Sequence, residues 1–187
     1  MRRRVLTLLA AGLAGCGGGQ REDSGLPVGA RPIGRAARFH LPLRPDAAIR
    51  GCRPGLGARF GVHLELFGEG KVALFPAGIG TGAPRRTFSG RIEHARCYGP
   101  LVTIDPTGLV LLRPGTRATV GDVFDLWGQP LSGRGAARFE GDVLAYVNGE
   151  LTAGSPRDIP LRRHDEIVLE VGSEVPPHRS YRFPASW

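Results

Sequence analysis

The sequence predicts an α+β fold that is mostly β and contains one short helix. Short apolar runs bounded by Gly, Pro, Asn and Asp recur along the chain, as is typical of strands and hairpins. One segment, residues 119–128, instead has apolar residues at helical spacing. About 150 residues lie outside the N-terminal segments that we assign below to export, which is enough for one domain with a hydrophobic core. We therefore expect a single globular domain at residues 39–187.

The first expected element of this domain is a β-hairpin at residues 62–75. Apolar residues recur at every second position from residue 62, as in a half-buried strand. The three-residue segment Gly68-Glu69-Gly70 then predicts a hairpin loop, and residues 72–75 form the returning strand. Residues 76–90 are rich in Gly, Pro and Thr, which predicts a long loop.

A second hairpin is expected at residues 101–112. Its strands are residues 101–104 and 109–112, and both are short apolar runs. Between them, Asp105-Pro106-Thr107-Gly108 fits a type I turn, because Asp, Pro and Gly occupy the first, second and fourth positions.

The helical segment follows this hairpin. Thr119 is placed to cap the helix, and Asp122 stands three residues later as an Asp variant of the capping box. Gly128 is placed to end it. Four residues form one apolar stripe at helical spacing: Val120, Val123, Phe124 and Trp127.

Two further strands complete the domain. Residues 143–147 form the first, and the Asn148-Gly149 pair after it suits a type I′ turn, since both positions need a positive φ. Residues 167–171 form the last strand, which the chain enters through the polar corner Arg163-His164-Asp165-Glu166.

The order strand, strand, helix, strand, strand over residues 101–172 resembles the β-grasp fold of ubiquitin-like and sulfur-carrier proteins. The segment Tyr146-Val147-Asn148-Gly149 and the run at residues 159–172 also resemble motifs of those carriers. The resemblance implies a β-grasp-like domain preceded by the hairpin at residues 62–75. Sulfur carriers act through a C-terminal Gly-Gly, which the ending Pro184-Ala185-Ser186-Trp187 lacks, so a carrier role is not expected.

The first fifteen residues have the pattern of an export signal. Three Arg residues precede an apolar stretch at residues 5–13, which is too short to span a bilayer, since spanning needs roughly 20 residues. It has the length of a secretory signal core. Leu13-Ala14-Gly15-Cys16 resembles the lipobox of bacterial lipoproteins, which implies a signal peptide at residues 1–15 and a lipid on the Cys16 sulfur. An ordinary signal peptide with a chance Cys, or a cytosolic protein with an apolar start, are the alternatives.

Residues 16–38 are expected to be a lipidated, flexible tether. They are rich in Gly, Arg, Pro and Ala and have few large apolar residues, so they cannot bury enough surface to order themselves. The expected location is the cell envelope. The chain would be anchored to membrane lipid on the outer face of the cytoplasmic membrane, or in the outer membrane of a bacterium that has one.

The formal net charge of +8 does not indicate a nucleic-acid partner. Three of the basic residues lie in the predicted signal, and Lys71 is the only lysine. The Arg residues are scattered along the chain and are not interleaved with aromatic residues, as they would be in a nucleic-acid site.

The two remaining cysteines, Cys52 and Cys97, are expected to form a disulfide. If Cys16 is lipidated, they are left as a pair in an oxidising compartment. Neither belongs to a CxxC motif or stands near a His at zinc spacing, which argues against a structural zinc site. Two free buried thiols are the alternative.

Residues 52–172 also resemble a family of uncharacterised extracytoplasmic proteins from GC-rich bacteria. The matching motifs include His63-Leu64-Glu65-Leu66-Phe67 and residues 120–128. Members carry clustered His residues, which suggests a transition-metal site. In this chain only His63 remains, and other residues occupy the family's His and Glu positions: Arg59, Gly61, Val102, Ile104, Leu111 and Arg113. A single His cannot hold a metal, so no metal or cofactor is expected, and His63 is expected to be solvated.

No catalytic signature stands out. His94, His164 and Asp165 could form a triad only with a nucleophile, and no Ser occupies a G-x-S-x-G elbow. We therefore expect a non-enzymatic lipoprotein whose domain binds another envelope protein or component. The alternative is a copper- or zinc-handling lipoprotein with a degenerate site, in which His63 is a remnant ligand.

Overall fold

The computed structural model describes residue 43, residues 49–172 and residues 176–187. The expected signal peptide, tether and start of the domain lie outside these residues. No helix in the described part of the chain is both long and apolar enough to cross a membrane.

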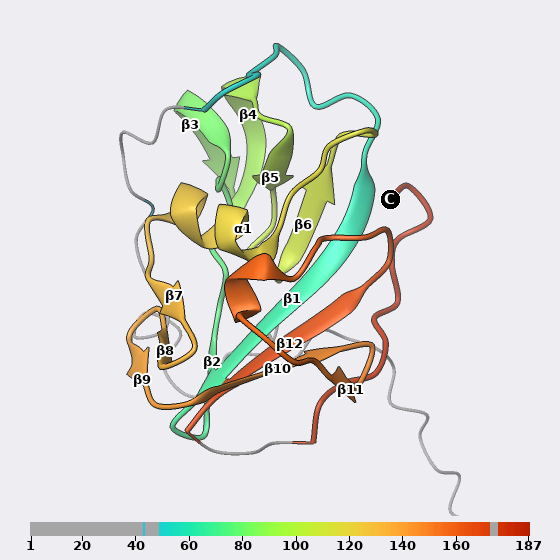
Figure 1. Cartoon of the computed structure of the whole chain (residues 1–187). Helices are drawn as coiled ribbons and strands as arrows, with labels where there is room; N and C mark the ends of the chain where they lie inside the picture. Colours follow the sequence, from blue (N-terminus) through green and yellow to red (C-terminus); the bar gives the residue numbers. More distant parts are fainter. Residues whose placement is uncertain (1–42, 44–48, 173–175) are drawn as a thin grey trace, which may run out of the picture.

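A mixed β-sheet organises the molecule (Figure 1), in the order β11-β10-β12-β1-β6-β5, with β2 also paired to β1. Strands β1 and β12 run parallel, and the other neighbouring pairs are antiparallel. The expectation of a mostly β fold is confirmed, and the described residues contain one α-helix. The strands are β1 (Phe60–Gly68), β2 (Lys71–Ala73), β5 (Leu101–Thr103), β6 (Leu109–Leu112), β10 (Val143–Val147), β11 (Glu150–Leu151) and β12 (Glu166–Val171).

The hairpin expected at residues 62–75 is present, but it lies at the centre of the sheet. Strand β1 is hydrogen-bonded to β12 on one side and to β6 on the other, so it separates the two halves of the expected strand order. Its turn to β2 has two residues instead of the expected three, Glu69 and Gly70, both with positive φ. This geometry matches the right-handed twist of the flanking strands.

Helix α1 (Val120–Trp127) forms as expected, and it covers one face of the sheet. Thr119 and Asp122 form the capping box, and Gly128 ends the helix in the left-handed conformation. The apolar stripe is buried, with Trp127 0% exposed. It contacts the alternate residues of the sheet strands that face it, among them Val62, Leu64, Leu66, Val110, Leu112, Ile167 and Leu169.

The expectation of a long loop at residues 76–90 is wrong. Strand β3 (Thr81–Phe88) pairs with β4 (Arg91–Tyr98) in a two-stranded sheet. Most side chains of β3 are exposed, so its sequence lacks the apolar alternation by which strands are recognised, and backbone pairing defines it. Three short strands were likewise not expected: β7 (Leu131–Ser132), β8 (Gly135–Ala136) and β9 (Phe139–Glu140).

Cys52 and Cys97 form a disulfide, as the sequence predicts. Their Cα atoms are 5.5 Å apart, and the bond ties strand β4 to the segment that precedes β1. It spans 45 residues of sequence.

The other face of the sheet is covered by strand β4 and by the C-terminal segment, residues 176–187. Tyr181, Phe183 and Trp187 of this segment pack against a second apolar cluster. This cluster consists of Ile92, Ala95, Tyr98, Val102, Ile104, Leu109 and Leu111. Because side chains alternate along a strand, the residues of β1 that turn away from the helix face this layer.

Candidate functional site

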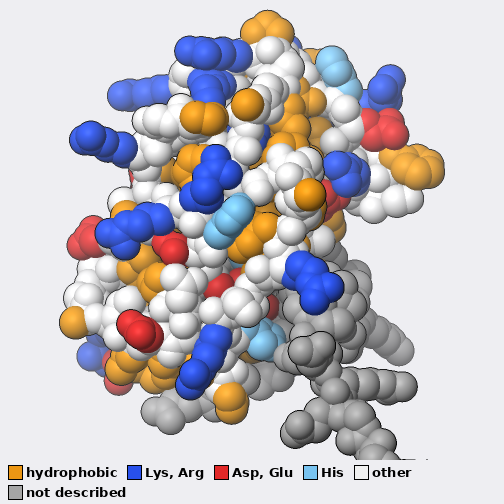
Figure 2. Space-filling model, turned by 90° about the vertical axis from the view of Figure 1, so that its right-hand side faces the viewer, with side chains coloured by type: hydrophobic (Ala, Val, Ile, Leu, Met, Phe, Trp, Pro, Cys, Tyr) orange, Lys and Arg blue, Asp and Glu red, His pale blue; other side chains and the backbone are white. Residues whose placement is uncertain are grey.

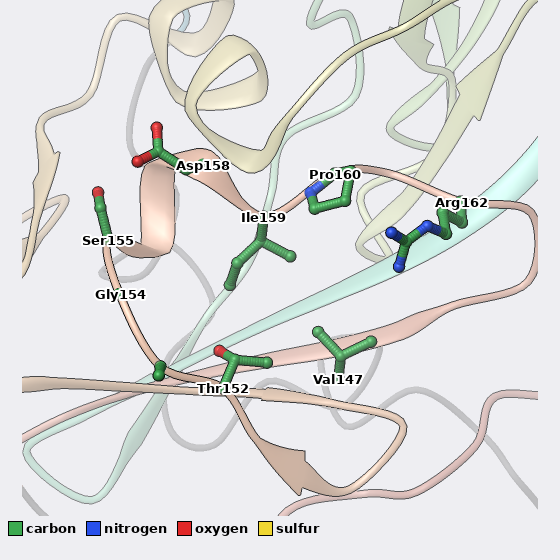
Figure 3. Close-up of a pocket in the computed structure, with 9 residues that line it drawn as sticks. Val147, Thr152, Gly154, Ser155, Asp158, Ile159, Pro160 and Arg162 are labelled. Carbon is green, nitrogen blue, oxygen red and sulfur yellow. The ribbon is translucent and has the colours of Figure 1, made fainter.

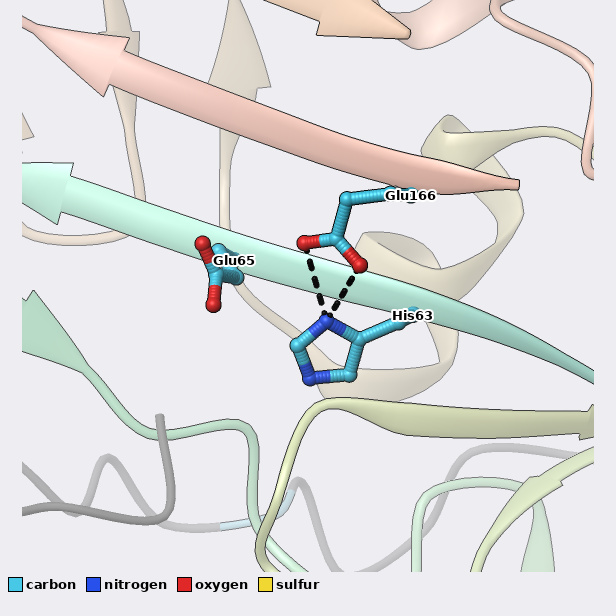
Figure 4. A group of neighbouring side chains, drawn as sticks. All are labelled: His63, Glu65 and Glu166. Carbon is cyan, nitrogen blue, oxygen red and sulfur yellow. Dashed lines mark hydrogen bonds and ion pairs between the residues drawn. The ribbon is translucent and has the colours of Figure 1, made fainter. Parts of the chain in front are cut away.

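Three ionisable side chains meet on the face of the sheet that turns away from helix α1 (Figure 4). His63 and Glu65 are two residues apart on β1 and so share a face, and the parallel register places Glu166 of β12 beside His63. Each is only 1% exposed. One ligand atom from each of the three lies within 4.8 Å of the other two.

Both ring nitrogens of His63 have partners. Nε2 lies 2.9 Å from the carbonyl oxygen of Thr107, so it carries a hydrogen and donates it. Nδ1 lies 2.8 Å and 3.0 Å from the two carboxyl oxygens of Glu166. The Tyr181 ring stacks on the imidazole, with centroids 4.0 Å apart and planes 8° from parallel. These contacts hold the ring with Nδ1 directed at the carboxyl group of Glu166.

Gly108 allows the turn at residues 105–108 to approach His63 closely. Its φ of 82° is unfavourable for a side chain. A Cβ at this position would meet the Leu64 carbonyl and the His63 ring. The expected turn at residues 105–108 therefore brings the Thr107 carbonyl to the imidazole, a role that its sequence did not reveal.

Burial decides the protonation of the His63–Glu166 pair. It lowers the pKa of His63 to about 4, because an imidazolium would lose its hydration. Burial also raises the pKa of Glu166 to about 9, and the negative charge of Glu65 adds to the rise. At neutral pH the imidazole is therefore neutral, and the protonated Glu166 donates a hydrogen bond to Nδ1. The pair shares one proton.

A second imidazole reaches the cluster from the C-terminal segment. Nδ1 of His178 lies 2.7 Å from Oε2 of Glu65. The His178 side chain is 32% exposed, whereas Glu65 is buried. Two imidazoles and two carboxyl groups are thus arranged as two contacting pairs, His63 with Glu166 and His178 with Glu65.

The structure corrects the expectation that His63 is a solvated side chain, since this residue lies in the interior. Sequence reasoning also missed its three neighbours. The position of Glu65, two residues after a His on an alternating strand, was a usable signal, because such residues share a face. No such signal pointed to Glu166 or His178. Glu166 lies 103 residues from its partner His63, and His178 lies 113 residues from its partner Glu65.

The other positions singled out by the His-rich family resemblance have structural roles. Val102, Ile104 and Leu111 belong to the apolar cluster under the C-terminal segment. A Cβ on Gly61 would come within 2.8 Å of the Phe183 ring, so that ring occupies the space beside this glycine.

The two arginines at positions singled out by the same resemblance bind backbone carbonyls. Arg59 donates to the carbonyl oxygens of Leu56, Pro100 and Leu111. Arg113 donates to those of Gly51, Tyr98 and Gly99. Both guanidinium groups thus hold the segments around the disulfide.

The residues considered for a catalytic triad lie in different elements. His94 is exposed on β4. His164 lies at the corner before β12, where Nε2 is 2.9 Å from the Trp187 carbonyl oxygen. Asp165 accepts a hydrogen bond from the side-chain amide of Asn148 at 3.0 Å. The His164-Asp165 pair thus stabilises this corner.

A separate open pocket of about 440 Å³ lies between the end of β10 and the short helix η3 (Pro156–Asp158) (Figure 3). Val147 and Thr152 line one side and Ile159 the other, while Asp158 and Arg162 supply opposite charges. On the face shown in Figure 2, the described Lys and Arg side chains are interspersed with acidic and hydrophobic ones.

No known protein family, curated protein or solved structure matches this chain. The function of the candidate site must therefore be inferred from its geometry.

Proposed function

We propose that this protein is an exported lipoprotein, anchored to the outer face of a membrane through an acylated Cys16. The lipobox-like segment Leu13-Ala14-Gly15-Cys16 supports this proposal. The Cys52–Cys97 disulfide supports it independently, because disulfides persist in extracytoplasmic compartments and are rare in the cytosol. Two or more acyl chains would give stable anchoring, where one binds only marginally.

We also propose that the domain is β-grasp-like. The four strands β6, β1, β12 and β10 are neighbours in that order, with the central pair parallel. Helix α1 lies between β6 and β10 in sequence and covers this sheet. In this assignment the first strand of the β-grasp fold is β1 and not β5.

The function that the geometry supports best is the binding of a divalent transition-metal ion. The observation that carries this proposal is the cluster of His63, Glu65 and Glu166, three potential ligands that are each 1% exposed. Two carboxylates close together in the interior repel one another and lose hydration, unless protons or a cation compensate them. A divalent cation would neutralise both.

The surroundings of His63 also suit a metal ligand. A metal-bound imidazole usually donates its second N–H to a carbonyl or carboxylate, which fixes the ring. His63 does this through Nε2 and the Thr107 carbonyl, leaving Nδ1 toward the cluster. Imidazole nitrogen with carboxylate oxygen is a donor set that zinc accepts and that a calcium or magnesium site seldom uses.

A second candidate function is the non-catalytic binding of another envelope component. The open pocket beside β10 favours it, because it combines apolar walls at Val147 and Ile159 with charged groups. Leu151 on the edge strand β11 is 61% exposed, which adds apolar surface on the same hairpin. Neither candidate function requires catalysis.

Calorimetric titration of the full chain with zinc(II) and copper(II) tests the metal proposal. The chain is extracted in detergent and first stripped with a chelator. We expect one ion per chain at micromolar affinity or tighter. Glu166→Gln should weaken binding at least about tenfold, because an amide can still donate to Nδ1 of His63 but carries no charge. His94→Ala, which removes an exposed His, is the matched control. A wild-type chain that takes up neither ion refutes the proposal.

A further inference from the structure

Side chains of the C-terminal segment reach the cluster of His63, Glu65 and Glu166. Residues 176–187 contain no helix or strand. Tyr181 stacks on His63, and Phe183 lies beside Gly61 and stacks on His164 with centroids 4.6 Å apart. The segment thus crosses the sheet directly over the cluster.

His178 connects this segment to the buried carboxyl groups. Its Nδ1 atom is 2.7 Å from Oε2 of Glu65, whereas Nδ1 of His63 contacts Glu166, so each imidazole contacts one carboxyl group of the cluster. It is also the most exposed of the four residues. An ion that approached from solvent would therefore meet His178 before it reached His63.

The charges of the four groups and of a divalent ion sum to zero. Two carboxylates contribute two negative charges, and two neutral imidazoles contribute none. A neutral assembly costs far less to bury than a charged one. Among the described residues, the ligand atoms of His63, Glu65 and Glu166 already lie within 4.8 Å of one another. A shift of His178 toward them would complete the tetrahedral coordination that zinc prefers.

We infer that His178 is the fourth ligand of this site and that the C-terminal segment, residues 176–187, is a strap whose docking is coupled to metal binding. The inference rests on the metal-binding function proposed above. The ion links Glu65 and Glu166 of the sheet to His178 of the strap, so it stabilises the docked strap. By reciprocity, the docked strap strengthens binding of the ion by the same factor.

Two measurements on the full chain in detergent test the coupling: zinc affinity, by competition with a chromogenic chelator, and amide hydrogen exchange of residues 176–187. In the wild type we expect zinc to slow exchange across the strap at least about tenfold.

His178→Ala should still bind zinc, at least about tenfold more weakly, and should lose the zinc-dependent protection. Tyr181→Ala keeps all four ligands but removes the stacked ring, so it should weaken binding by a smaller factor. His94→Ala should match the wild type.

The outcomes separate the two proposals. A wild-type chain that binds no zinc overturns the metal-binding function and this inference with it. Equal zinc affinity in the wild type and His178→Ala, with strap exchange unchanged by zinc, overturns the coupling and leaves the function intact. Circular dichroism of His178→Ala without metal checks that the variant is folded, and Tyr181→Ala supplies a second measure of strap docking.

Discussion

Raising the pH above neutral should lower the free energy of unfolding of the metal-free chain, because the His63–Glu166 pair then loses its proton. The pair retains one proton in the folded chain up to about pH 9, the raised pKa of Glu166. In the unfolded chain, Glu166 ionises near 4.5 and His63 loses its proton near 6.5, the ordinary pKa values. Between pH 6.5 and pH 9, folding therefore retains a proton that the unfolded chain has released.

The sign and size of the effect follow from linkage. Because the pKa of Glu166 is raised, its stabilising contribution is full below 4.5 and is lost as the pH rises toward 9. Because the pKa of His63 is lowered, its contribution is full above 6.5 and is lost as the pH falls toward 4. Between pH 4.5 and pH 6.5, the contributions of Glu166 and His63 to the free energy of unfolding change in opposite directions and cancel. Above 6.5 one proton remains unbalanced, so the free energy of unfolding falls by about 1.4 kcal/mol per pH unit, in total about 3 kcal/mol up to pH 9.

Urea denaturation in the presence of a chelator, at half-unit steps of pH, measures this slope. All other ionisable groups are common to the wild type and Glu166→Gln, so the informative quantity is the difference between these two proteins. The amide donates to Nδ1 at every pH and has no proton to lose, so this variant should lack the extra slope. Parallel curves for the two proteins from pH 7 to pH 9 would show that the pair holds no proton, and the reasoning would fail.

Three further predictions concern the fold and the anchor. Trp127→Ala should lower the free energy of unfolding by about 3–5 kcal/mol, as loss of a large buried aromatic does; a native Trp127 that acrylamide quenches freely would contradict its place in the core. Opening the Cys52–Cys97 bond, which spans 45 residues, should cost about 4 kcal/mol in the chain-entropy description. Urea curves of the oxidised chain and of the Cys52→Ser, Cys97→Ser double variant measure this cost, and two alkylatable thiols in protein from the envelope would argue against the bond. A palmitate analogue should label the wild type and not Cys16→Ser, and label that persists in the variant would exclude the anchor.

Local sequence signals predicted the elements whose structure is defined locally. Helix α1 was recognisable because its cap, its apolar stripe and its terminal glycine all lie within ten residues. The turn at Asn148-Gly149 was predicted for the same reason, and both residues have positive φ. Strand β3 was missed because its exposed Arg and Thr residues carry no burial pattern, so only its pairing with β4 defines it.

The candidate site was only partly predictable because its residues meet through long-range pairing. His63 was identified, but only as a remnant. The parallel register of β1 with β12 brings Glu166 to it, and no local pattern specifies that register. The hypothesis of a degenerate metal site depended on imidazoles of the expected strands, whereas the cluster consists of His63 and Glu65 of β1 and Glu166 of β12, with His178 beside it.

The apolar residues at the positions where the resemblance implies His favour the metal site proposed here. Val102, Ile104 and Leu111 pack with Tyr181 and Phe183 on the face of the sheet that carries His63. Such a wall excludes water, and electrostatic attraction is stronger where the surroundings are less polarisable. The apolar residues at positions 102, 104 and 111 therefore do not exclude binding, provided that Glu65 and Glu166 remain buried together.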